Sequence, residues 1–409
     1  MAVLAINAGS SSLKFALYPV QDEQISSALL SGIIEGLQPG GQISLSWQRD
    51  GQCFQRQLEQ SAKTPDPFEV ALRALQILLD EVMQGESQQL GNPMQLHAIS
   101  HRVVHGGERY RAAVLVDQAV LKNLSSLSPL APLHQPHNLA GITAFMRALP
   151  NVPQIACFDT AFHSEMPKEE YLFAIPLNLS EQGIRRYGFH GLSYQYVSEK
   201  LFQLTERAHG RVIMAHLGNG ASLCGMQAGK SLTTTMGFSA LDGLMMGTRC
   251  GAIDAGVLLH LLTQGWSEKQ IQDLLYKQSG LLGVSGISAD MRQLSGSEKP
   301  NAKLAIQMFT RRVIREIGAL TATLGGVDVI AFTGGIGEHS HALRQAVCQQ
   351  LAFLGIELAP EQNLSADGKS TLRISSANST VEIWVIPTDE GLVAAQSALQ
   401  CLGALSKLN

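Results

Sequence analysis

The sequence lacks the features that mark secreted, membrane-spanning or zinc-binding proteins. Its six cysteines form no Cys-x-x-Cys pair and no Cys/His cluster with metal-ligand spacing, so we expect reduced thiols. No apolar run reaches the roughly 18 residues that cross a bilayer. The N-terminus has neither the basic region nor the apolar length of a signal peptide. We therefore expect a cytoplasmic protein with no membrane partner.

Charge is also scarce, because only 16 % of the residues are charged and the formal net charge is −4. Nucleic-acid-binding proteins usually carry a basic patch, and this composition gives no sign of one, so we expect no nucleic-acid partner. What the chain does have is length and apolar material. Its 409 residues are 45 % hydrophobic, which is enough to bury two separate cores.

Two segments read as hairpins whose turns are rich in hydrogen-bond donors. Residues 7–14 (NAGSSSLK) follow a short apolar run and lead into a second one. Backbone N–H groups, hydroxyls and one lysine at a single turn suit phosphate oxygens, although such turns are also common hairpin tips. Residues 216–223 (HLGNGASL) repeat the pattern. The repetition indicates an internal duplication in which both halves bind phosphate.

Strands and helices alternate along both halves, which predicts two α/β domains. We place the first domain at residues 1–150 plus 388–409 and the second at residues 151–387. The glycine- and serine-rich stretch 279–300 is expected to be a loop. The expected strands are 24–34, 42–48, 96–104, 153–158, 211–216, 327–333 and 382–387; the expected helices are 66–82, 137–149, 254–262, 267–276, 301–324, 340–354 and 390–402.

Several arginines lie among glycines and apolar residues, with no carboxylate beside them in the sequence. They are Arg102, Arg249 and the pair Arg185 and Arg186. An arginine is usually solvated or part of a structural ion pair, but these surroundings favour binding of an anion from solution. Asp159 ends a predicted strand, where α/β sheets place functional groups, although it could equally cap a turn.

Nine strings along the chain together resemble the acetate kinase family, in that family's order and over nearly the whole length. They are NAGSSSLK (7–14), HRVVHGG (101–107), APLH (131–134), FDT (158–160), RRYGFHG (185–191), HLGNG (216–220), GLMMGTR (243–249), SGLLGVSG (279–286) and FTGGIGE (332–338). The resemblance implies two duplicated α/β domains of the ribonuclease-H-like, actin-like ATPase type. It also implies ATP in the interdomain cleft and a homodimer.

The resemblance implies the catalytic roles residue by residue. Asp159 matches the family's essential acid, which orients Mg²⁺ or the acceptor. Arg102 would bind the acyl carboxylate or its phosphoryl group, and His190 and Arg249 match the transition-state stabilisers. A carboxylate acceptor is already anionic at neutral pH, so direct phosphoryl transfer requires no general base.

The metal, nucleotide and acyl contacts follow from the same resemblance. Asn7 and Glu390 would hold Mg²⁺, with Mn²⁺ as the alternative metal, and Lys14 would contact the co-substrate ATP. The acyl pocket would be lined by Val104, Leu133, Phe189 and Ala240. The remaining ATP contacts would be His216, Leu217, Gly218, Asn219, Gly220, Asp290, Met291, Arg292, Gly335, Ile336, Gly337, Glu338 and His339.

The chain departs from the family pattern at several of these strings. Ala240 replaces a proline of the acyl pocket, which leaves room for about one methylene, whereas Val104 favours the smaller acid. The other departures are Leu192 and Tyr194 for Thr and His, Ser239 and Asp242 for Thr and Glu, Cys250 and Ala252 for Ser and Asp, His339 for Asn, and Asp389 and Gly391 for Asn and Glu.

The sequence leaves three functions open. The first is acetate kinase, which converts ATP and acetate reversibly to ADP and acetyl phosphate. The second is a short-chain acyl kinase that prefers propionate. The third is an actin-like ATP-binding protein that has lost transfer activity. The arginines and the histidine argue against the third, because a nucleotide switch has no need of a second anion site.

Overall fold

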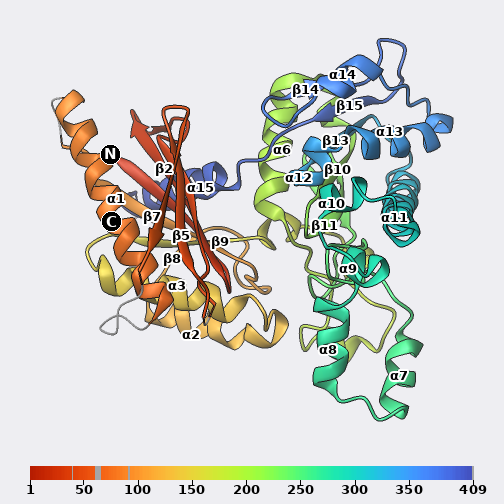
Figure 1. The fold of residues 1–409 in the computed structure, drawn as a ribbon, viewed down its shortest axis with the longest axis horizontal. Coiled ribbons are helices and arrows are strands. Elements are labelled where there is room, and N and C mark those ends of the chain that lie inside the picture. The colour runs from red at the N-terminus through yellow and green to blue at the C-terminus, as the bar shows by residue number, and fades with distance from the viewer. Residues whose placement is uncertain (39, 60–65, 91–92, 408–409) are drawn as a thin grey trace. The chain divides into compact units, whose positions relative to one another are not determined.

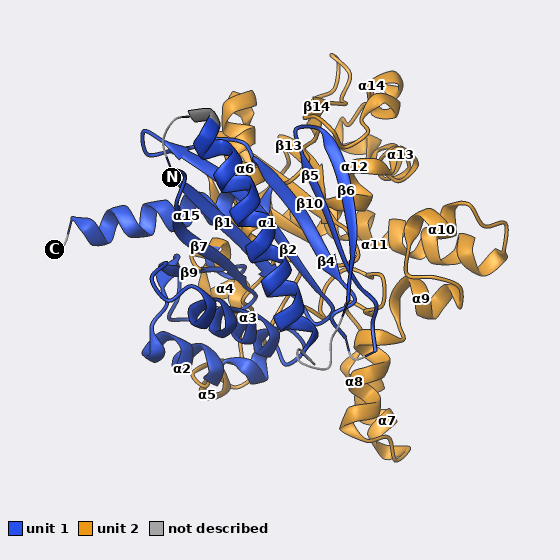
Figure 2. Cartoon of the chain, turned by 60° about the vertical axis from the view of Figure 1, so that its left-hand side comes forward, with its two compact units in different colours: residues 1–161, 389–409 blue, residues 162–388 orange. Residues whose placement is uncertain are grey.

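The computed structural model describes residues 1–38, 40–59, 66–90 and 93–407. The chain divides into two compact units, each with one sheet between helices (Figures 1 and 2). Unit 1 comprises residues 1–161 and 389–409, and unit 2 comprises residues 162–388. A boundary at residue 150 would separate the strand 154–158 from the sheet of unit 1 to which it belongs.

The described strands of unit 1 form one sheet in the order β6-β5-β4-β2-β1-β7-β9-β8, with β3 paired to β2. β1 pairs antiparallel with β2 and parallel with β7, and β7 pairs parallel with β9. The strands are β1 (Ala2–Ala8), β2 (Ser12–Gln21), β3 (Gln24–Ile25), β4 (Leu30–Glu35), β5 (Ile43–Arg49), β6 (Gln52–Leu58), β7 (Leu96–Val103), β8 (Val114–Leu115) and β9 (Gln154–Phe158).

The described residues of unit 1 contain four α-helices: α1 (Pro67–Leu90), α2 (Gln118–Ser126), α3 (Gln135–Ala148) and α15 (Glu390–Ser406). A short 3₁₀ turn, η1 (Ser128–Leu130), joins α2 to α3. The apolar stripe of α1, which includes Leu72, Leu75 and Val82, packs into the core with β1, β2, β4 and β5, as its spacing predicts. α15 contacts β1, β7 and β9 and so belongs to unit 1 despite its late place in the sequence (Figure 2).

The described strands of unit 2 form a sheet in the order β12-β11-β10-β13-β15-β14. β10 pairs antiparallel with β11 and parallel with β13, and β13 pairs parallel with β15. The strands are β10 (Arg211–Leu217), β11 (Ala221–Gln227), β12 (Lys230–Thr234), β13 (Val329–Thr333), β14 (Leu372–Arg373) and β15 (Glu382–Val385).

Most helices of the chain belong to unit 2. One apolar cluster joins α6 residues such as Val197 and Leu201 to the inner strands, and α11 packs on β10 and β11. The helices are α4 (Lys168–Tyr171), α5 (Leu177–Ser180), α6 (Gly191–Leu204), α7 (Ala255–Thr263), α8 (Glu268–Lys277), α9 (Gly280–Ser285), α10 (Met291–Ser295), α11 (Pro300–Leu324), α12 (Gly334–His339), α13 (His341–Gln350) and α14 (Pro360–Ser365), with 3₁₀ turns at Ala161–His163, Glu206–His209 and Ala352–Leu354.

The predicted loop at residues 279–300 is wrong, because α9 and α10 lie within it. Glycine and serine content suggested a loop, but tertiary packing decides the structure here. Leu281 and Leu294 are fully buried, and both helices contact α11. The Asp290 side chain accepts a hydrogen bond from the Arg292 backbone N–H and so caps α10.

The two units repeat one strand arrangement, which confirms the predicted duplicated α/β fold. In unit 1 the order β4-β2-β1-β7-β9 combines antiparallel pairing on one side of β1 with parallel pairing on the other. The order β12-β11-β10-β13-β15 does the same around β10. The two hairpins found in the sequence, β1–β2 and β10–β11, therefore occupy equivalent places. Across the described residues, no helix is long and apolar enough to cross a membrane.

The buried histidine His101 on β7 should make the free energy of unfolding depend on pH. Nε2 of His101 donates a hydrogen bond to Oε1 of Gln154 at 2.7 Å, and burial lowers the pKa of His101 from 6.5 to about 4. Because its folded-state pKa is depressed, its contribution to stability is complete above pH 6.5 and is lost as the pH falls toward 4. We expect His101 to reduce the free energy of unfolding by roughly 2–3 kcal/mol between pH 6.5 and 4.5.

Urea titration at the two pH values measures this loss. The variant His101→Gln should show a pH dependence that is smaller by the same amount. His97→Gln is the matched control, since His97 lies on the same strand but is only partly buried. Equal pH dependence in all three proteins would contradict the prediction.

Candidate active site

Four predicted residues of unit 1 lie at the ends of its parallel strands or beside them. Asn7 and Lys14 face each other across the β1–β2 hairpin, so their side chains project from the same face of the sheet. Arg102 is near the end of β7, and Asp159 directly follows β9. The carboxyl ends of parallel strands are where α/β folds bind ligands.

Arg102 and Asp159 form a bidentate ion pair. Nε of Arg102 donates to Oδ1 of Asp159 at 2.9 Å, and Nη2 donates to Oδ2 at 2.6 Å. Glu390 adds a second carboxylate, 3.7 Å from Nε. Burial by itself lowers the pKa of Arg102, but the two carboxylates outweigh it and raise that pKa above its ordinary value. The sequence showed no carboxylate beside Arg102, because both of its partners are distant in the sequence.

Two amide side chains of α3 fix the segment that follows Arg102, and sequence analysis missed both. The Asn138 amide accepts from the Val104 N–H at 3.0 Å and donates to the Ala8 carbonyl at 2.7 Å. Gln135 accepts from the His105 N–H at 3.2 Å and donates to the His105 carbonyl at 3.0 Å. Their position on the buried face of an amphipathic helix could have indicated that both side chains are hydrogen-bonded inside the protein.

The first turn of α15 places Glu390 beside Arg102. Asp389 caps the helix by accepting from the Leu392 N–H at 2.9 Å, and its Oδ1 also accepts from the Tyr18 hydroxyl at 2.6 Å. A Cβ on Gly391 would lie 2.5 Å from that hydroxyl. Gly391, which replaces a glutamate of the family pattern, therefore makes room for Tyr18.

In unit 2, His190 and His216 form the centre of a second cluster. Their rings stack with centroids 4.2 Å apart. The Nδ1 atom of His190 lies 2.8 Å from Ser222 Oγ, and that of His216 lies 2.8 Å from Ser193 Oγ. His190 adopts a left-handed backbone conformation, with φ of 59°, at the cap of α6, which is uncommon for a residue other than glycine.

Arg249 reaches the same cluster at the tip of the β10–β11 hairpin. Its Nη1 donates to the Ala240 carbonyl at 2.6 Å. A Cβ on Gly220 would lie 2.8 Å from Nη2 of Arg249 and 3.3 Å from Nε2 of His190. The two donor atoms therefore converge beside Gly220, where a side chain would displace them.

The neighbouring pair Arg185 and Arg186 is structural. Arg185 lies over the Tyr171 ring, 3.5 Å from its centroid. Arg186 donates to the carbonyls of Thr234, Thr235 and Met236 and lies 3.6 Å from Asp242. Asp242, like the partners of Arg102, is distant in the sequence and so was not visible beside Arg186.

The predicted nucleotide loops 216–220 and 335–339 lie together. A Cβ on Gly218 would be 3.9 Å from the Gly335 nitrogen, and β10 pairs with β13, which leads directly into α12. The expected strand 327–333 and the expected helix from residue 340 leave residues 334–339 without an element, but these residues form α12. Glu338 does not point away from the protein, since its Oε1 accepts from the N–H groups of Gly334 at 2.8 Å and Thr388 at 3.1 Å.

A fully buried arginine that the sequence analysis missed holds the end of α12. Arg344 donates from Nη1 to the carbonyls of Gly337 and Glu338, both at 2.8 Å. Its other donors bind Asn363 and the Ala366 carbonyl. Burial lowers the pKa of Arg344 to about 10, and the guanidinium is stabilised by neutral oxygens. This network fixes the C-terminal end of α12, which carries Gly337 and His339.

The remaining predicted ATP contacts have mixed surroundings. Asp290 and Arg292 form an exposed bidentate pair at 2.6 Å, whereas Met291 is buried and can offer a ligand little beyond its backbone.

Of the predicted acyl contacts, Val104 and Leu133 belong to unit 1, and Phe189 and Ala240 to unit 2. Phe189 precedes His190, and Ala240 binds Arg249, so these two join the second cluster.

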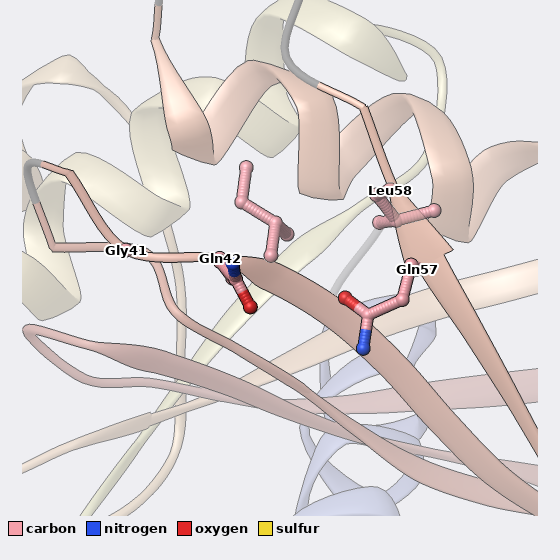
Figure 3. Close-up of a pocket in the computed structure, with 5 residues that line it drawn as sticks. Gly41, Gln42, Gln57 and Leu58 are labelled. Carbon is pink, nitrogen blue, oxygen red and sulfur yellow. The ribbon is translucent and has the colours of Figure 1, made fainter.

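A pocket of about 370 Å³ elsewhere in unit 1 contains none of these residues. It is lined by Gly41, Gln42, Ile43, Gln57 and Leu58 (Figure 3). These side chains offer amides but no cation to neutralise a phosphate. We therefore do not assign nucleotide binding to it.

Comparison with known proteins decides the family. The model of the Acetokinase family matches residues 2–396. The chain belongs to the acetokinase family. It is 46 % identical to the acetate kinase of Rhodopseudomonas palustris (strain CGA009) over 96 % of each chain.

Solved structures agree with this membership of the acetokinase family. A propionate kinase from Francisella tularensis is similar with a TM-score of 0.85 and 36 % identity, over 97 % of this chain and 98 % of that one. The Porphyromonas gingivalis acetate kinase is similar with a TM-score of 0.83 and 34 % identity, over 98 % and 99 %. The fold of the family is therefore the fold of this chain.

Proposed function

We propose that this protein transfers the γ-phosphoryl group of ATP to acetate, giving acetyl phosphate and ADP, and that it catalyses the reverse reaction. The observation that carries the proposal is the convergence of His190 Nε2 and Arg249 Nη2 beside Gly220. Phosphoryl transfer requires little covalent help but needs donors around the three equatorial oxygens of the transferred group. These two side chains supply such donors at the predicted nucleotide hairpin.

The unit 1 cluster would bind the other reactant. Arg102 offers a planar guanidinium that suits a carboxylate or a phosphoryl group. Both oxygens of Asp159 already accept hydrogen bonds from Arg102, so its role is to orient that arginine and the reactants. Acetate needs no deprotonation at neutral pH, which is consistent with an aspartate that does not act as a base.

We propose Mg²⁺ as the metal, with Mn²⁺ as the alternative, held by Asn7 and Glu390. Among the described residues, no three His, Cys, Asp or Glu side chains form a metal-binding group. Mg²⁺ in kinases is typically bound by one or two protein oxygens together with phosphates and water. The amide of Asn7 and the carboxylate of Glu390 fit that requirement. The metal would neutralise charge on the nucleotide phosphates.

A hydroxamate assay tests the proposed function. Hydroxylamine traps the acyl phosphate, so ATP-dependent and acetate-dependent hydroxamate formation should be observed. Formation with propionate but little with acetate would favour the short-chain acyl kinase. Nucleotide binding without hydroxamate from either acid would favour the ATP-binding protein without transfer activity.

We expect acetate to be the best acceptor, with propionate within about tenfold in kcat/KM, because alanine at position 240 is smaller than the proline of the family pattern by about one methylene of room, whereas valine at position 104 favours the smaller acid. Competing measurements of kcat/KM for the two acids test this. Ala240→Pro restores the family residue and keeps the carbonyl that Arg249 binds, so it should shift the ratio further toward acetate. A wild-type preference for propionate would overturn the prediction.

We also propose that the protein is a cytoplasmic homodimer. All six cysteines lie in the described ranges and are free thiols, which is typical of a reducing compartment. The helix α7 leaves Val257, Leu259 and Leu262 exposed and has no buried residue. Such an uncharged apolar surface is typical of self-association. Light scattering coupled to size-exclusion chromatography measures the mass of the assembly.

A further inference from the structure

The second cluster contains a buried chain of hydroxyl groups behind the face that His190 presents beside Gly220. Tyr194 lies in the first turn of α6, and its backbone N–H donates to the carbonyl of the cap residue His190 at 3.0 Å. Ser222 lies on β11. Ser222 and Tyr194 are both fully buried. Tyr194 Oη lies 2.5 Å from Ser222 Oγ, which in turn lies 2.8 Å from His190 Nδ1.

Only one arrangement of protons along Tyr194, Ser222 and His190 gives every buried donor an acceptor. Burial raises the pKa of Tyr194 well above its ordinary value, so the phenol keeps its single proton. Among the described residues, its hydrogen-bond partners are Ser222 Oγ and the backbone of His216, whose N–H is itself a donor. Tyr194 must therefore donate to Ser222, and the proton of Ser222 is directed at His190 Nδ1.

The opposite order leaves a buried donor without an acceptor. If His190 Nδ1 carried the proton, the protons of Nδ1, Ser222 Oγ and Tyr194 Oη would share only two contacts, Nδ1–Oγ and Oγ–Oη. Either the serine proton or the phenolic proton would then have no acceptor among the described residues, a penalty large enough to change an equilibrium at least tenfold. The neutral His190 ring is thus held with its proton on Nε2.

We propose that Tyr194 is a positioning residue, which acts through Ser222 to hold His190 as the Nε2–H tautomer. Nε2 is the atom that converges with Nη2 of Arg249 beside Gly220. His190 then donates a hydrogen bond as a neutral imidazole to the anion that Arg249 binds. The kinetic part of this inference rests on the proposed function, whereas the tautomer does not.

Tyr194 is also a departure from the family pattern, which has histidine at this position. An imidazole can donate or accept at either nitrogen, according to its tautomer. The Tyr194 phenol has one proton, and because its other neighbour is the His216 N–H, it can donate only to Ser222. The substitution therefore fixes a proton order that histidine leaves open.

Nitrogen NMR of histidine-labelled protein tests the tautomer without any substrate. The His190 resonances are assigned by their loss in His190→Gln. In the wild type we expect Nε2 to be protonated and Nδ1 to be bare. In Tyr194→Phe the Ser222 hydroxyl is free to rotate, so the ratio of Nδ1–H to Nε2–H should rise at least tenfold. Ser222→Ala should raise it similarly, and the double variant should add little.

Kinetics of the same proteins complete the test. Tyr194→Phe should lower kcat about tenfold and leave KM for acetate and ATP within about twofold. Tyr187→Phe is the matched control, since it removes another buried tyrosine hydroxyl of unit 2, one that donates to the Gly183 carbonyl at 2.9 Å. It should change neither the tautomer nor kcat.

The outcomes separate this inference from the proposed function. A wild-type His190 protonated on Nδ1, or a Tyr194→Phe spectrum identical to the wild type, would overturn it whatever the activity. If the protein lacks acyl kinase activity but shows the expected tautomer shift, the positioning role of Tyr194 stands and the proposed function is refuted. Thermal unfolding of each variant confirms that the measured protein is folded.

Discussion

Arg249→Ala is expected to lower kcat at least a hundredfold while unit 2 stays folded. That loss corresponds to about 2.7 kcal/mol of transition-state stabilisation, and comparable arginines contribute roughly 10³ to 10⁵ in rate. The Ala240 carbonyl fixes one end of the guanidinium, which leaves Nη2 beside Gly220 and His190 Nε2. Arg249→Lys should recover part of the rate, because it keeps the charge but loses the planar pair of donors.

Steady-state kinetics with saturating ATP and acetate measure this effect. Arg185→Ala serves as the matched control, since Arg185 belongs to the same unit but stacks on Tyr171. We expect it to leave kcat within about threefold. Near-normal turnover of Arg249→Ala would remove Arg249 from the site.

Arg102→Ala is also expected to lower kcat at least a hundredfold, and it should reduce stability as well. Removing Arg102 leaves Asp159, which is 1 % exposed, without its bidentate partner. Breaking a buried ion pair costs about 3–5 kcal/mol, and partial exposure of Arg102 places this case at the lower end. Adding Asp159→Ala should restore most of the stability, because the fully buried partner charge is then removed and only the partly exposed Glu390 is left without Arg102, yet it should not restore activity.

The cycle of Arg102→Ala, Asp159→Ala and the double variant separates the two roles. Urea unfolding gives the coupling energy of the pair, and kcat gives its catalytic contribution. Arg49→Ala is the control, since Arg49 pairs with Glu86 at 2.9 Å in the same unit but is not a predicted site residue. If the double variant regained both stability and turnover, Arg102 would be a structural residue alone.

Local patterns predicted the elements that carry the candidate site. The hairpins, the strand before Asp159 and the stripe of α1 are all set by nearby residues, through turn composition and hydrophobic period. The stretch 279–300 was misassigned because its helices are stabilised by burial of Leu281 and Leu294 against α11. Contacts with a distant helix leave little trace in a local window.

The partners of the site residues were beyond the reach of sequence analysis. Arg102 looked unpaired because Asp159 is 57 positions away, and Glu390 is farther still. The same reason hid Asn138, which ties Val104 to Ala8, and Arg344, which binds carbonyl groups. A hydrogen bond to a backbone carbonyl has no sequence signature in the partner, since every residue type offers one.

The place of α15 in unit 1 has a consequence for how the protein is made. Unit 2 lies between the two parts of unit 1 in the sequence, so the ribosome releases all of unit 2 before it delivers α15. Domains tend to fold as they emerge. The first sheet to be synthesised must therefore wait, with the surfaces of β1, β7 and β9 that α15 will cover still open, until the second unit has been translated.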